Sequence, residues 1–441
     1  MKQIIICLLV LCSSISCKHI ADKHTSITHN AMLYCTTVKA LNDVVLENNF
    51  PPMIAARNYA YANIAAYECI AAGNNTYTSL ANQIKGLSYI PKPSTTNIDF
   101  NLAALFAFIK VGNTVTFPEG SMLGIYSKLK DTVQNNGIPT ELLNNTIAYA
   151  DTVVAAIIAW SKKDNYAQTR TAVKYTVQSN VPGRWVPTPP SYAQAIEYNW
   201  KLIRPIAIDS AAQFKPLPPP AFNVTNTQSV FYKATTEVKI IGDSLTDDQK
   251  NIANFFDDNP FKMNVSGHVM FATKKFSPAG HWMNIVGIAS QNTKADFAKT
   301  VYAYTQTAIA LFDGFISCWD EKYRSNLVRP ETVINKTVDP NWRPLIQTPP
   351  FPSYTSGHSV ISAAAAQVLT HIYGNNVAFK DSSEREFGLP DRSFTSFKQA
   401  ANEASISRLY GGIHYRFDID EGAKMGEQLG KFIVSKLKMK N

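Results

Sequence analysis

Apolar residues recur at three- and four-residue spacing along most of this 441-residue chain, and this pattern most constrains its fold. Such spacing places apolar side chains on one face of an α-helix, whereas the alternation typical of a strand is rare here. The pattern predicts an all-α protein whose helices pack into bundles. Helices are expected near residues 28–49, 52–72, 99–111, 139–162, 192–203, 228–240, 246–256, 293–320, 359–373 and 421–438.

A proline-rich passage between residues 180 and 222 interrupts this helical pattern. It contains "VPGRWVPTPPSYAQ" and "FKPLPPPAF", and it leaves room for only one short helix. Proline lacks the backbone N–H that a continuing helix needs, so the passage is expected to be a long ordered crossover. We therefore predict one compact unit of two packed helical bundles, an N-terminal half (17–179) and a C-terminal half (223–441).

The first residues have the order of a targeting segment. Lys2 precedes the apolar run "IIICLLVLC", and the serine-rich "SSIS" then leads to Cys17. This is the arrangement of a secretory signal peptide, and its apolar run is too short to span a membrane. Cys17 stands where a bacterial lipoprotein is cleaved and acylated, although Ser14 occupies a position that is usually Leu. We expect residues 1–16 to be removed and the mature chain to be exported to the cell envelope.

A lipid on Cys17 would anchor the mature protein to a bacterial membrane; simple secretion and a chance cysteine are the alternatives. No later segment has the roughly 18 consecutive apolar residues of a membrane-spanning helix, so membrane contact is expected only through the lipid. The formal charge of +9 is modest for this length and the lysines are scattered. A nucleic-acid partner is therefore not expected. The sequence does not indicate an oligomeric state.

Three cysteines remain once the leader and Cys17 are set aside: Cys35, Cys69 and Cys318. They form no CxxC pattern of the kind that binds zinc. An exported protein can hold a disulfide, and Cys35–Cys69 is the best candidate pair. Three buried free thiols are the alternative.

The stretch "EKYRSNLVRPET", residues 321–332, is the first group of residues that could carry chemistry. Lys322 and Arg329 are seven positions apart, which is two helical turns, so we expect both on one face of a helix that begins near Thr293. Pro330 is expected to end that helix and to place Arg329 at its terminus. A solvent-exposed cationic face is the ordinary alternative.

The stretch "PPFPSYTSGHSVISAAAAQVL", residues 349–369, is the second group. A proline-framed loop leads into an alanine-rich helix, with Ser356 or Ser359 as N-cap and the Gly357 amide placed to face an anion. The alanines allow close helix packing that would hold the loop rigidly. The tripeptide SGH alone is weak evidence for an anion site, because it recurs in "VSGHVMF" (265–271) without such a loop. We interpret His268, in that second copy, as structural.

The stretch "SISRLYGGIHYRFDIDEG", residues 405–422, is the third group. The helix that carries Arg408 should end at the glycine pair 411–412, because glycine commonly terminates helices. His414 and Asp418 are then four positions apart on one helical face. Asp418 can accept the Nδ1 proton of His414 and leave Nε2 as a free lone pair, suited to a nucleophile or a ligand. A surface His–Asp pair is the alternative.

Taken together, the three groups predict a cage for a tetrahedral oxyanion. His414 would attack or ligate the central atom of the oxyanion, Asp418 would orient His414, and His358 would act as general acid or base. The oxyanion ligands would be Lys322, Arg329, Arg408, the Ser356 hydroxyl and the Gly357 amide.

The pattern K-x6-RP, then SGH, then SR-x5-H-x3-D occurs in order within residues 322–418. The chain thereby resembles the superfamily of type 2 phosphatidic acid phosphatases, bacterial class A acid phosphatases and vanadium-dependent haloperoxidases. The resemblance implies the all-α fold of that superfamily. It also implies that His414 is either the phosphohistidine nucleophile or the histidine that binds vanadium, that His358 is the acid/base residue and that Asp418 orients His414.

Several features favour the haloperoxidases within this superfamily. The chain is longer than an acid phosphatase needs, it lacks the membrane helices of the lipid phosphatases, and "PSYTSGH" has the haloperoxidase form. Phe351 stands where haloperoxidases carry Phe or His. Trp319 could line the same pocket, and a role in the core is the equal alternative. Looser matches to exported bacterial haloperoxidase-like proteins occur at 51–68, 181–192 and 277–285.

The resemblance thus implies an enzyme that binds vanadate and oxidises a halide with hydrogen peroxide. The first alternative is an acid phosphatase that hydrolyses phosphate monoesters through a phosphohistidine and needs no cofactor. The second is a lipid-anchored oxyanion-binding protein without turnover. Either enzyme would act on small molecules.

Overall fold

Long helices dominate the computed structural model, which describes residues 23–260, 262–266, 269–272 and 274–441. This confirms the predicted all-α class. The strands of the described residues form two short antiparallel ribbons. These are β1 (Met263–Ser266) with β2 (Val269–Ala272), and β3 (Phe379–Asp381) with β4 (Arg392–Phe394). The predicted signal peptide, Cys17 and His268 lie outside the described residues and stay predictions.

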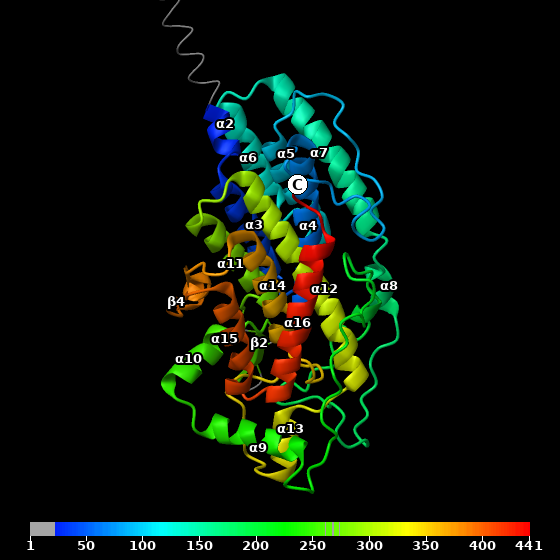
Figure 1. Ribbon diagram of the computed structural model, residues 1–441, viewed down its shortest axis with the longest axis vertical. Coiled ribbons are helices and arrows are strands. Elements are labelled where there is room, and N and C mark those ends of the chain that lie inside the picture. Colours follow the sequence, from blue (N-terminus) through cyan, green and yellow to red (C-terminus); the bar gives the residue numbers. More distant parts are fainter. Residues whose placement is uncertain (1–22, 261, 267–268, 273) are drawn as a thin grey trace, which may run out of the picture.

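The N-terminal half forms the upper end of the molecule in Figure 1. Its centre is α4, whose residues from Pro52 to Ile70 are all buried. This helix packs on α5, α7 and α12, so it needs apolar side chains on every face. The helices of this half are α2 (Lys23–Thr28), α3 (Ala31–Glu47), α4 (Pro52–Gly73), α5 (Phe100–Val115), α6 (Leu123–Asn135), α7 (Thr140–Ser161) and α8 (Tyr166–Thr171).

Among the described helices, α7 is long and apolar enough to cross a membrane by length and composition. Its buried residues, such as Tyr149, Val153, Ile157 and Trp160, recur every three or four positions. They pack on α5 and α4 of the same bundle. The helix is therefore placed as one wall of the N-terminal core.

The crossover contains no α-helix between Thr171 and Val230, only the short 3-10 helix η1 (Trp200–Leu202). The predicted helix over 192–203 is therefore wrong. Tyr192 and Glu197 both adopt left-handed backbone conformations, with φ of 47° and 54°. Such residues cannot propagate a right-handed helix, whatever the spacing of the apolar side chains.

Asp313 of α12 ties the crossover to the core. Its buried carboxylate accepts the amide N–H groups of Ile206, Ala207 and Ile208 at 2.7, 2.7 and 3.0 Å. These three hydrogen bonds satisfy backbone donors that a buried loop would otherwise leave unpaired. The predicted ordered crossover is thus held in place by a side chain of the second half.

The C-terminal half shares one hydrophobic core with the first, because α12 packs against both α4 and α14. In Figure 1 the helix α12 runs diagonally from the upper helices past the red α16. The elements of this half are α9 (Val230–Asp243), α10 (Asp247–Phe255), α11 (Pro278–Asn292), α12 (Phe297–Ser325), α13 (Pro330–Thr337), α14 (Gly357–Tyr373), η2 (Ser383–Phe387), α15 (Phe397–Tyr410) and α16 (Arg416–Lys436).

The predicted helix 293–320 begins later than expected. Thr293 is the C-cap of α11, and the following Lys294 has a left-handed φ of 52°. Asp296 is the N-cap of α12, where its side chain accepts the Lys299 amide at 2.7 Å. The apolar pattern therefore continues across a break between two helices.

Helices α14 and α16 approach closely enough that their backbones touch through glycines. A Cβ added at Gly426 would lie 2.0 Å from the Val360 carbonyl oxygen, and one at Gly430 would lie 2.8 Å from that of Ala364. Ala363 and Ala364 of α14 lie at this contact, and their small side chains agree with the predicted close packing. This packing holds the N-terminus of α14 in place.

The three remaining cysteines are free and buried, which confirms the alternative of three buried thiols, and the candidate Cys35–Cys69 disulfide is absent. Cys35 and Cys69 belong to α3 and α4, and both thiols are part of the apolar core.

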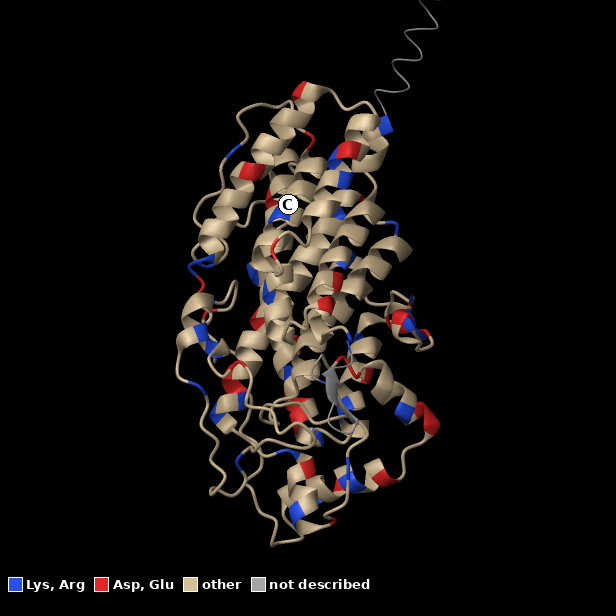
Figure 2. Cartoon of the chain, turned by 180° about the vertical axis from the view of Figure 1, so that it is seen from behind, with Lys and Arg blue, Asp and Glu red and all other residues tan. Residues whose placement is uncertain are grey.

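Charged residues of both signs are interspersed in the view of Figure 2, which agrees with the scattered lysines of the sequence.

Candidate active site

Lys322 and Arg329 come from different elements that meet at a corner. Asn326, with a left-handed φ of 48°, ends α12, and Pro330 begins α13 with Arg329 as its N-cap. The prediction of one helix with both cations on the same face is therefore wrong. Proline is favoured in the first turn of a helix as well as after its end, and the sequence does not distinguish the two positions.

Lys322 is fully buried and its ammonium group is held by backbone carbonyls. Its Nζ donates to the carbonyl oxygens of Pro352, Ser353 and Thr355 at 3.0, 3.0 and 2.6 Å. Burial lowers the pKa of Lys322 to about 7, but three carbonyl acceptors require the three N–H donors of the ammonium form. The side chain shapes the proline-framed loop and places a cationic group beneath it.

Arg329 is fully buried and its guanidinium points toward the third group of the sequence. Its Nε donates to the Phe351 carbonyl at 2.9 Å, and Nη1 donates to the Ile413 carbonyl at 2.7 Å. Its Nη2 has no hydrogen-bond partner within the described residues. Burial lowers the pKa of Arg329 to about 10, so the group stays charged.

The loop before α14 is positioned as predicted. Ser356 is the N-cap, and its Oγ accepts the Ser359 amide at 3.3 Å. Its own amide donates to the Asp418 carbonyl oxygen at 3.0 Å, which joins the loop to α16. Gly357 and His358 form the first turn of α14, where unpaired amide groups favour an anion.

Arg408 lies in the last turn of α15, and the chain turns at Gly411 and Gly412 as predicted. A φ of 76° at Gly412 is strained for any side chain, and an added Cβ would lie 3.0 Å from both Trp342 and Pro344. The turn brings Arg408 and His414 to the same pocket. Arg408 donates from Nε to Ser407 Oγ at 2.9 Å and from Nη2 to the Phe256 carbonyl.

His414 is held from both sides of its ring. Nδ1 lies 2.8 Å from Asp418 Oδ2, and Arg329 Nη1 lies 3.1 Å from Nε2. His414 precedes α16 and Asp418 lies in its first turn, so the pair forms across a helix start rather than along a helix face. Burial, together with the charges of Arg329 and Lys322, holds the pKa of His414 well below its ordinary value. The imidazole is therefore neutral near neutral pH.

Asp418 is itself fixed by the loop. Oδ2 accepts hydrogen bonds from the Ser353 hydroxyl and from the Tyr415 amide, the latter at 3.2 Å. Burial raises the pKa of Asp418 to about 6, against the lowering effects of the Ser353 hydrogen bond and the Lys322 charge. These contacts support the predicted role of orienting His414.

His358 faces the same pocket from the N-terminus of α14. Its Nε2 lies 3.6 Å from Asp258 Oδ2, an ion-pair distance longer than a hydrogen bond. Burial, followed by the charge of Arg408, lowers the pKa of His358 to about 4. Neutral His358 can therefore accept a proton at neutral pH.

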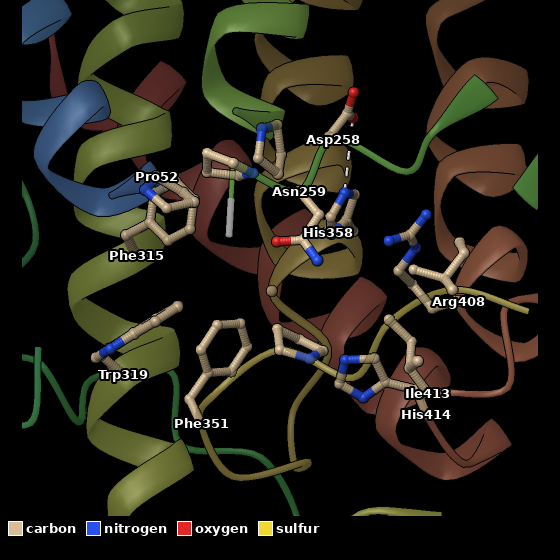
Figure 3. A pocket seen from close by; sticks show the side chains of 15 residues that line it. Pro52, Asp258, Asn259, Phe315, Trp319, Phe351, His358, Arg408, Ile413 and His414 are labelled. Carbon is tan, nitrogen blue, oxygen red and sulfur yellow. Dashed lines mark ion pairs between the residues drawn. The ribbon is translucent and has the colours of Figure 1, made fainter. Parts of the chain in front are cut away.

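The pocket between these groups has one polar and one aromatic side. Figure 3 shows Trp319 and Phe351 opposite Arg408 and His414, with His358 and Asn259 between them. The rings of Trp319 and Phe351 lie 5.0 Å apart and both line the pocket, while Trp319 also belongs to the buried core. The other lining residues include Pro52, Asp258, Pro260, Pro278, Phe315 and Ile346.

The chemistry of this donor set fits a tetrahedral oxyanion. Lys322, Arg329 and Arg408 are buried cations, and the pocket walls beside them are largely apolar. The Arg329 Nη2 donor without a partner is the kind of group that an anion would satisfy. The His414 Nε2 lone pair could hold the central atom. Of the residues that the three motifs nominated, Gly357, His358, Arg408 and His414 line the pocket. Lys322, Arg329 and Asp418 lie behind this lining, against Phe351 and His414, and Ser356 caps the helix that begins at Gly357.

The sequence did not nominate Asp258, Asn259 or Ser353. Asp258 and Asn259 follow α10 in "FFDDNPF", roughly a hundred residues from the SGH motif. Two acidic residues before Asn-Pro resemble an ordinary turn, so no local signal marks them. Ser353 lies inside the proline-framed loop of the second motif. Its place in that loop is a signal from which it could have been nominated, unlike Asp258 and Asn259.

Comparisons with known proteins agree with this geometry. A family model, described as the VCPO second helical-bundle domain, matches residues 302–440. A search of curated proteins gave no match. A solved structure described as the first bacterial vanadium-dependent iodoperoxidase is 47% identical, with a TM-score of 0.87, over 92% of this chain and 96% of that chain.

Two further solved structures share the fold. A holo-type bacterial vanadium-dependent chloroperoxidase is 18% identical over 88% of this chain and 92% of that chain, with a TM-score of 0.66. An apo-type structure of a bacterial vanadium-dependent chloroperoxidase is 17% identical over 88% of this chain and 94% of that chain, also with a TM-score of 0.66.

The fold and the caged histidine define a helical oxyanion-binding enzyme of the phosphatase and haloperoxidase superfamily. The 47% identity to the iodoperoxidase, over 92% of this chain, identifies the family within that superfamily. The chain belongs to the vanadium-dependent haloperoxidase family and is a haloperoxidase-like enzyme.

Proposed function

We propose that the protein binds vanadate and uses hydrogen peroxide to oxidise a halide, with iodide as its preferred substrate. The observation that carries this proposal is the neutral, doubly held His414 inside a cage of three buried cations. The likeness to an iodoperoxidase over nearly the whole chain supports the halide. The acid phosphatase reaction is the alternative that the experiment below tests.

The roles of the residues follow from their contacts. His414 would offer its Nε2 lone pair to vanadium, and Arg329, Arg408, Lys322, Ser356 and the Gly357 amide would compensate the charge of the oxyanion. Vanadate, when bound, supplies the Lewis-acidic centre at which hydrogen peroxide becomes a stronger oxidant. Asp418 and Ser353 keep His414 oriented throughout.

His358 would manage protons in this reaction. Its neutral imidazole can accept a proton from incoming hydrogen peroxide, and its protonated form can return a proton to the departing oxygen. The low pKa of about 4, caused mainly by burial, keeps the base available at neutral pH. A binding protein without turnover would not need this group.

The aromatic side of the pocket suits a large, weakly hydrated halide. Trp319 and Phe351 offer apolar and polarisable surface next to the cations, and Phe315 extends the same side. Iodide loses less hydration energy than chloride on entering such a pocket, and it is the more easily oxidised of the two. Both properties favour iodide without any additional activating group.

The test compares two reactions on the same purified protein. Oxidation of iodide, bromide and chloride is measured with vanadate and hydrogen peroxide, and hydrolysis of a chromogenic phosphate ester is measured without them. We expect oxidation that depends on vanadate and is fastest with iodide. Ester hydrolysis that vanadate inhibits, without halide oxidation, would identify a phosphatase instead.

A further inference from the structure

A second histidine, His281 of α11, lies behind the site with both ring nitrogens engaged by carboxylates. Its Nδ1 lies 3.0 and 3.2 Å from the two oxygens of Asp258, and its Nε2 lies 2.9 Å from Asp381 Oδ2. All three side chains are almost completely buried. The His281 ring also stacks on Phe256, with ring centroids 5.4 Å apart.

These contacts identify His281 as an imidazolium. A carboxylate oxygen only accepts, so each ring nitrogen must carry a proton to hold its partner. Burial acts to lower the pKa of His281, but the charges of Asp258 and Asp381 raise it well above its ordinary value. Burial likewise acts to raise the pKa of Asp258, yet His281 holds it below its ordinary value. Each group thus keeps the other charged.

Asp258 connects this pair to the active site. Its Oδ2, which faces His281 Nδ1, lies 3.6 Å from His358 Nε2. The dashed line in Figure 3 marks this second contact, above the pocket. Asp381, His281, Asp258 and His358 therefore form one continuous row from β3 to the N-terminus of α14.

The same cluster could be considered for a metal ion, because Asp258, His281 and Glu384 offer three ligand atoms within 4.8 Å of one another. A metal would need a free imidazole lone pair, and both His281 nitrogens are already hydrogen-bonded to carboxylates. Burial raises the pKa of Glu384 to about 8, so this carboxyl is neutral near neutral pH. The remaining charges are two carboxylates and one imidazolium, and the Arg408 guanidinium also interacts with Asp258, so positive charge is present without a metal.

We propose that His281 is a positioning residue that acts through Asp258 on His358. Its imidazolium holds the Asp258 carboxylate ionised and in place, and that carboxylate orients the acid/base histidine toward the pocket. The relevance of this row to catalysis rests on the function proposed above, whereas the row itself can be tested without vanadate.

The charges around His358 explain why such an arrangement matters. Burial, Arg408 and His281 act to lower the pKa of His358, and the Asp258 carboxylate acts to raise it. An Nε2 proton directed at Asp258 would leave Nδ1 as the lone pair of His358. If Asp258 became neutral or turned away, nothing among these groups would select that tautomer.

The experiment uses His281→Gln, Asp258→Asn and the double variant, with exposed His371→Gln on α14 as matched control. We expect the kcat of iodide oxidation to fall roughly tenfold in His281→Gln and 10- to 100-fold in Asp258→Asn, as for other outer partners of site residues. The double variant should lose no more than Asp258→Asn alone, because both changes act on one path. Vanadate affinity and the thermal midpoint of unfolding are measured on the three variants and the control. Affinity should be kept in all four proteins, which would show that the loss of kcat comes from positioning and not from unfolding.

A vanadate-free readout keeps the inference independent of the enzymatic assay. In protein labelled with ¹⁵N-histidine, His281 should show two protonated ring nitrogens at neutral pH, and the His358 signals should change in His281→Gln but not in His371→Gln. Unchanged His358 signals would overturn the proposal, as would additive losses of kcat. One equivalent of divalent metal in the purified protein, lost on Glu384→Gln, would overturn it in favour of a metal centre. Absence of halide oxidation in the unaltered protein would instead refute the proposed function.

Discussion

Arg329 Nη1 lies 3.1 Å from His414 Nε2, and this contact assigns the tautomer of the central histidine. A guanidinium group only donates hydrogen bonds, so Nε2 must accept and the ring proton must lie on Nδ1. Nδ1 in turn donates to Asp418 Oδ2 at 2.8 Å. The site therefore holds a neutral imidazole with its lone pair among the cations, ready for an electrophilic centre.

Replacement of His414 tests that assignment. His414→Ala removes the lone pair while Lys322, Arg329 and Arg408 remain, so we expect vanadate binding to weaken by more than 100-fold and halide oxidation to be lost. Calorimetric titration with vanadate, beside the iodide assay, measures both. Asp418→Asn keeps His414 but removes the charge that orients it, and should weaken vanadate binding by about 10- to 100-fold. Full activity of His414→Ala would refute the site assignment.

Replacement of His358 should separate catalysis from binding. The side chain would move protons and hold no oxyanion, so His358→Ala should lower kcat by about 10²- to 10⁴-fold while vanadate affinity changes little. Initial rates of iodide oxidation and vanadate titrations on one preparation decide this. If affinity falls as far as kcat does, His358 is an oxyanion ligand rather than a proton carrier.

Much of the site could be predicted because its parts are local in sequence. The N-cap of α14 at Ser356, the turn at Gly411 and the pairing of His414 with Asp418 each depend on residues within a few positions. Helix caps, glycine turns and pairs of nearby side chains can be predicted from a few neighbouring residues in the sequence. The convergence of the three motifs was predicted from the chemistry of their side chains taken together, and the family resemblance supported it.

The parts that the sequence did not reveal depend on distant contacts or on single backbone angles. Asp258 reaches His358 across a hundred positions, and nothing around it signals that contact. The apolar spacing over 192–203 is real, yet left-handed angles at Tyr192 and Glu197 prevent a helix there. Lys322 and Arg329 kept helical spacing although Asn326 ends α12 between them. Periodicity predicts which side chains are buried more reliably than where a helix ends.

The close contact of α14 with α16 should be intolerant of added volume. Gly426→Ala would place a methyl group 2.0 Å from the Val360 carbonyl oxygen, so the helices must separate. We expect a loss of about 1–3 kcal/mol in the free energy of unfolding, measured by urea denaturation. Gly124→Ala in exposed α6 meets no atom within 4 Å and should instead stabilise by about 0.5–1 kcal/mol. Equal effects at the two positions would contradict the packing argument.

We propose that the mature protein is exported and acylated at Cys17. The charged, apolar and serine-rich order of residues 1–16 motivates this. Cys17→Ser should move the protein from the membrane fraction to the soluble fraction of its bacterial host, because the acceptor of the lipid is gone. Cys12→Ser, in the same leader, should fractionate like the unaltered protein. Membrane association that survives Cys17→Ser would show that the anchor lies elsewhere.

Glu68 of α4 should make the stability of the N-terminal bundle depend on pH. Its side chain is buried, where Oε2 accepts from the Ser79 hydroxyl at 2.6 Å and Oε1 accepts from the Leu80 amide at 2.7 Å. Burial raises the pKa of Glu68 from 4.5 to about 7. The unfolded chain therefore releases this proton at lower pH than the folded protein does, and the contribution to stability is lost as the pH rises from 4.5 to 7.

Glu68→Gln removes that titration and keeps a side chain of the same shape. Relative to the unaltered protein, the variant should gain about 3 kcal/mol in the free energy of unfolding between pH 4.5 and 7.5, since each pKa unit corresponds to about 1.4 kcal/mol. Urea denaturation of both proteins across this range measures the difference, and the other titrating groups cancel because both proteins share them. Parallel stability curves would mean that Glu68 ionises in the folded protein as easily as in the unfolded chain.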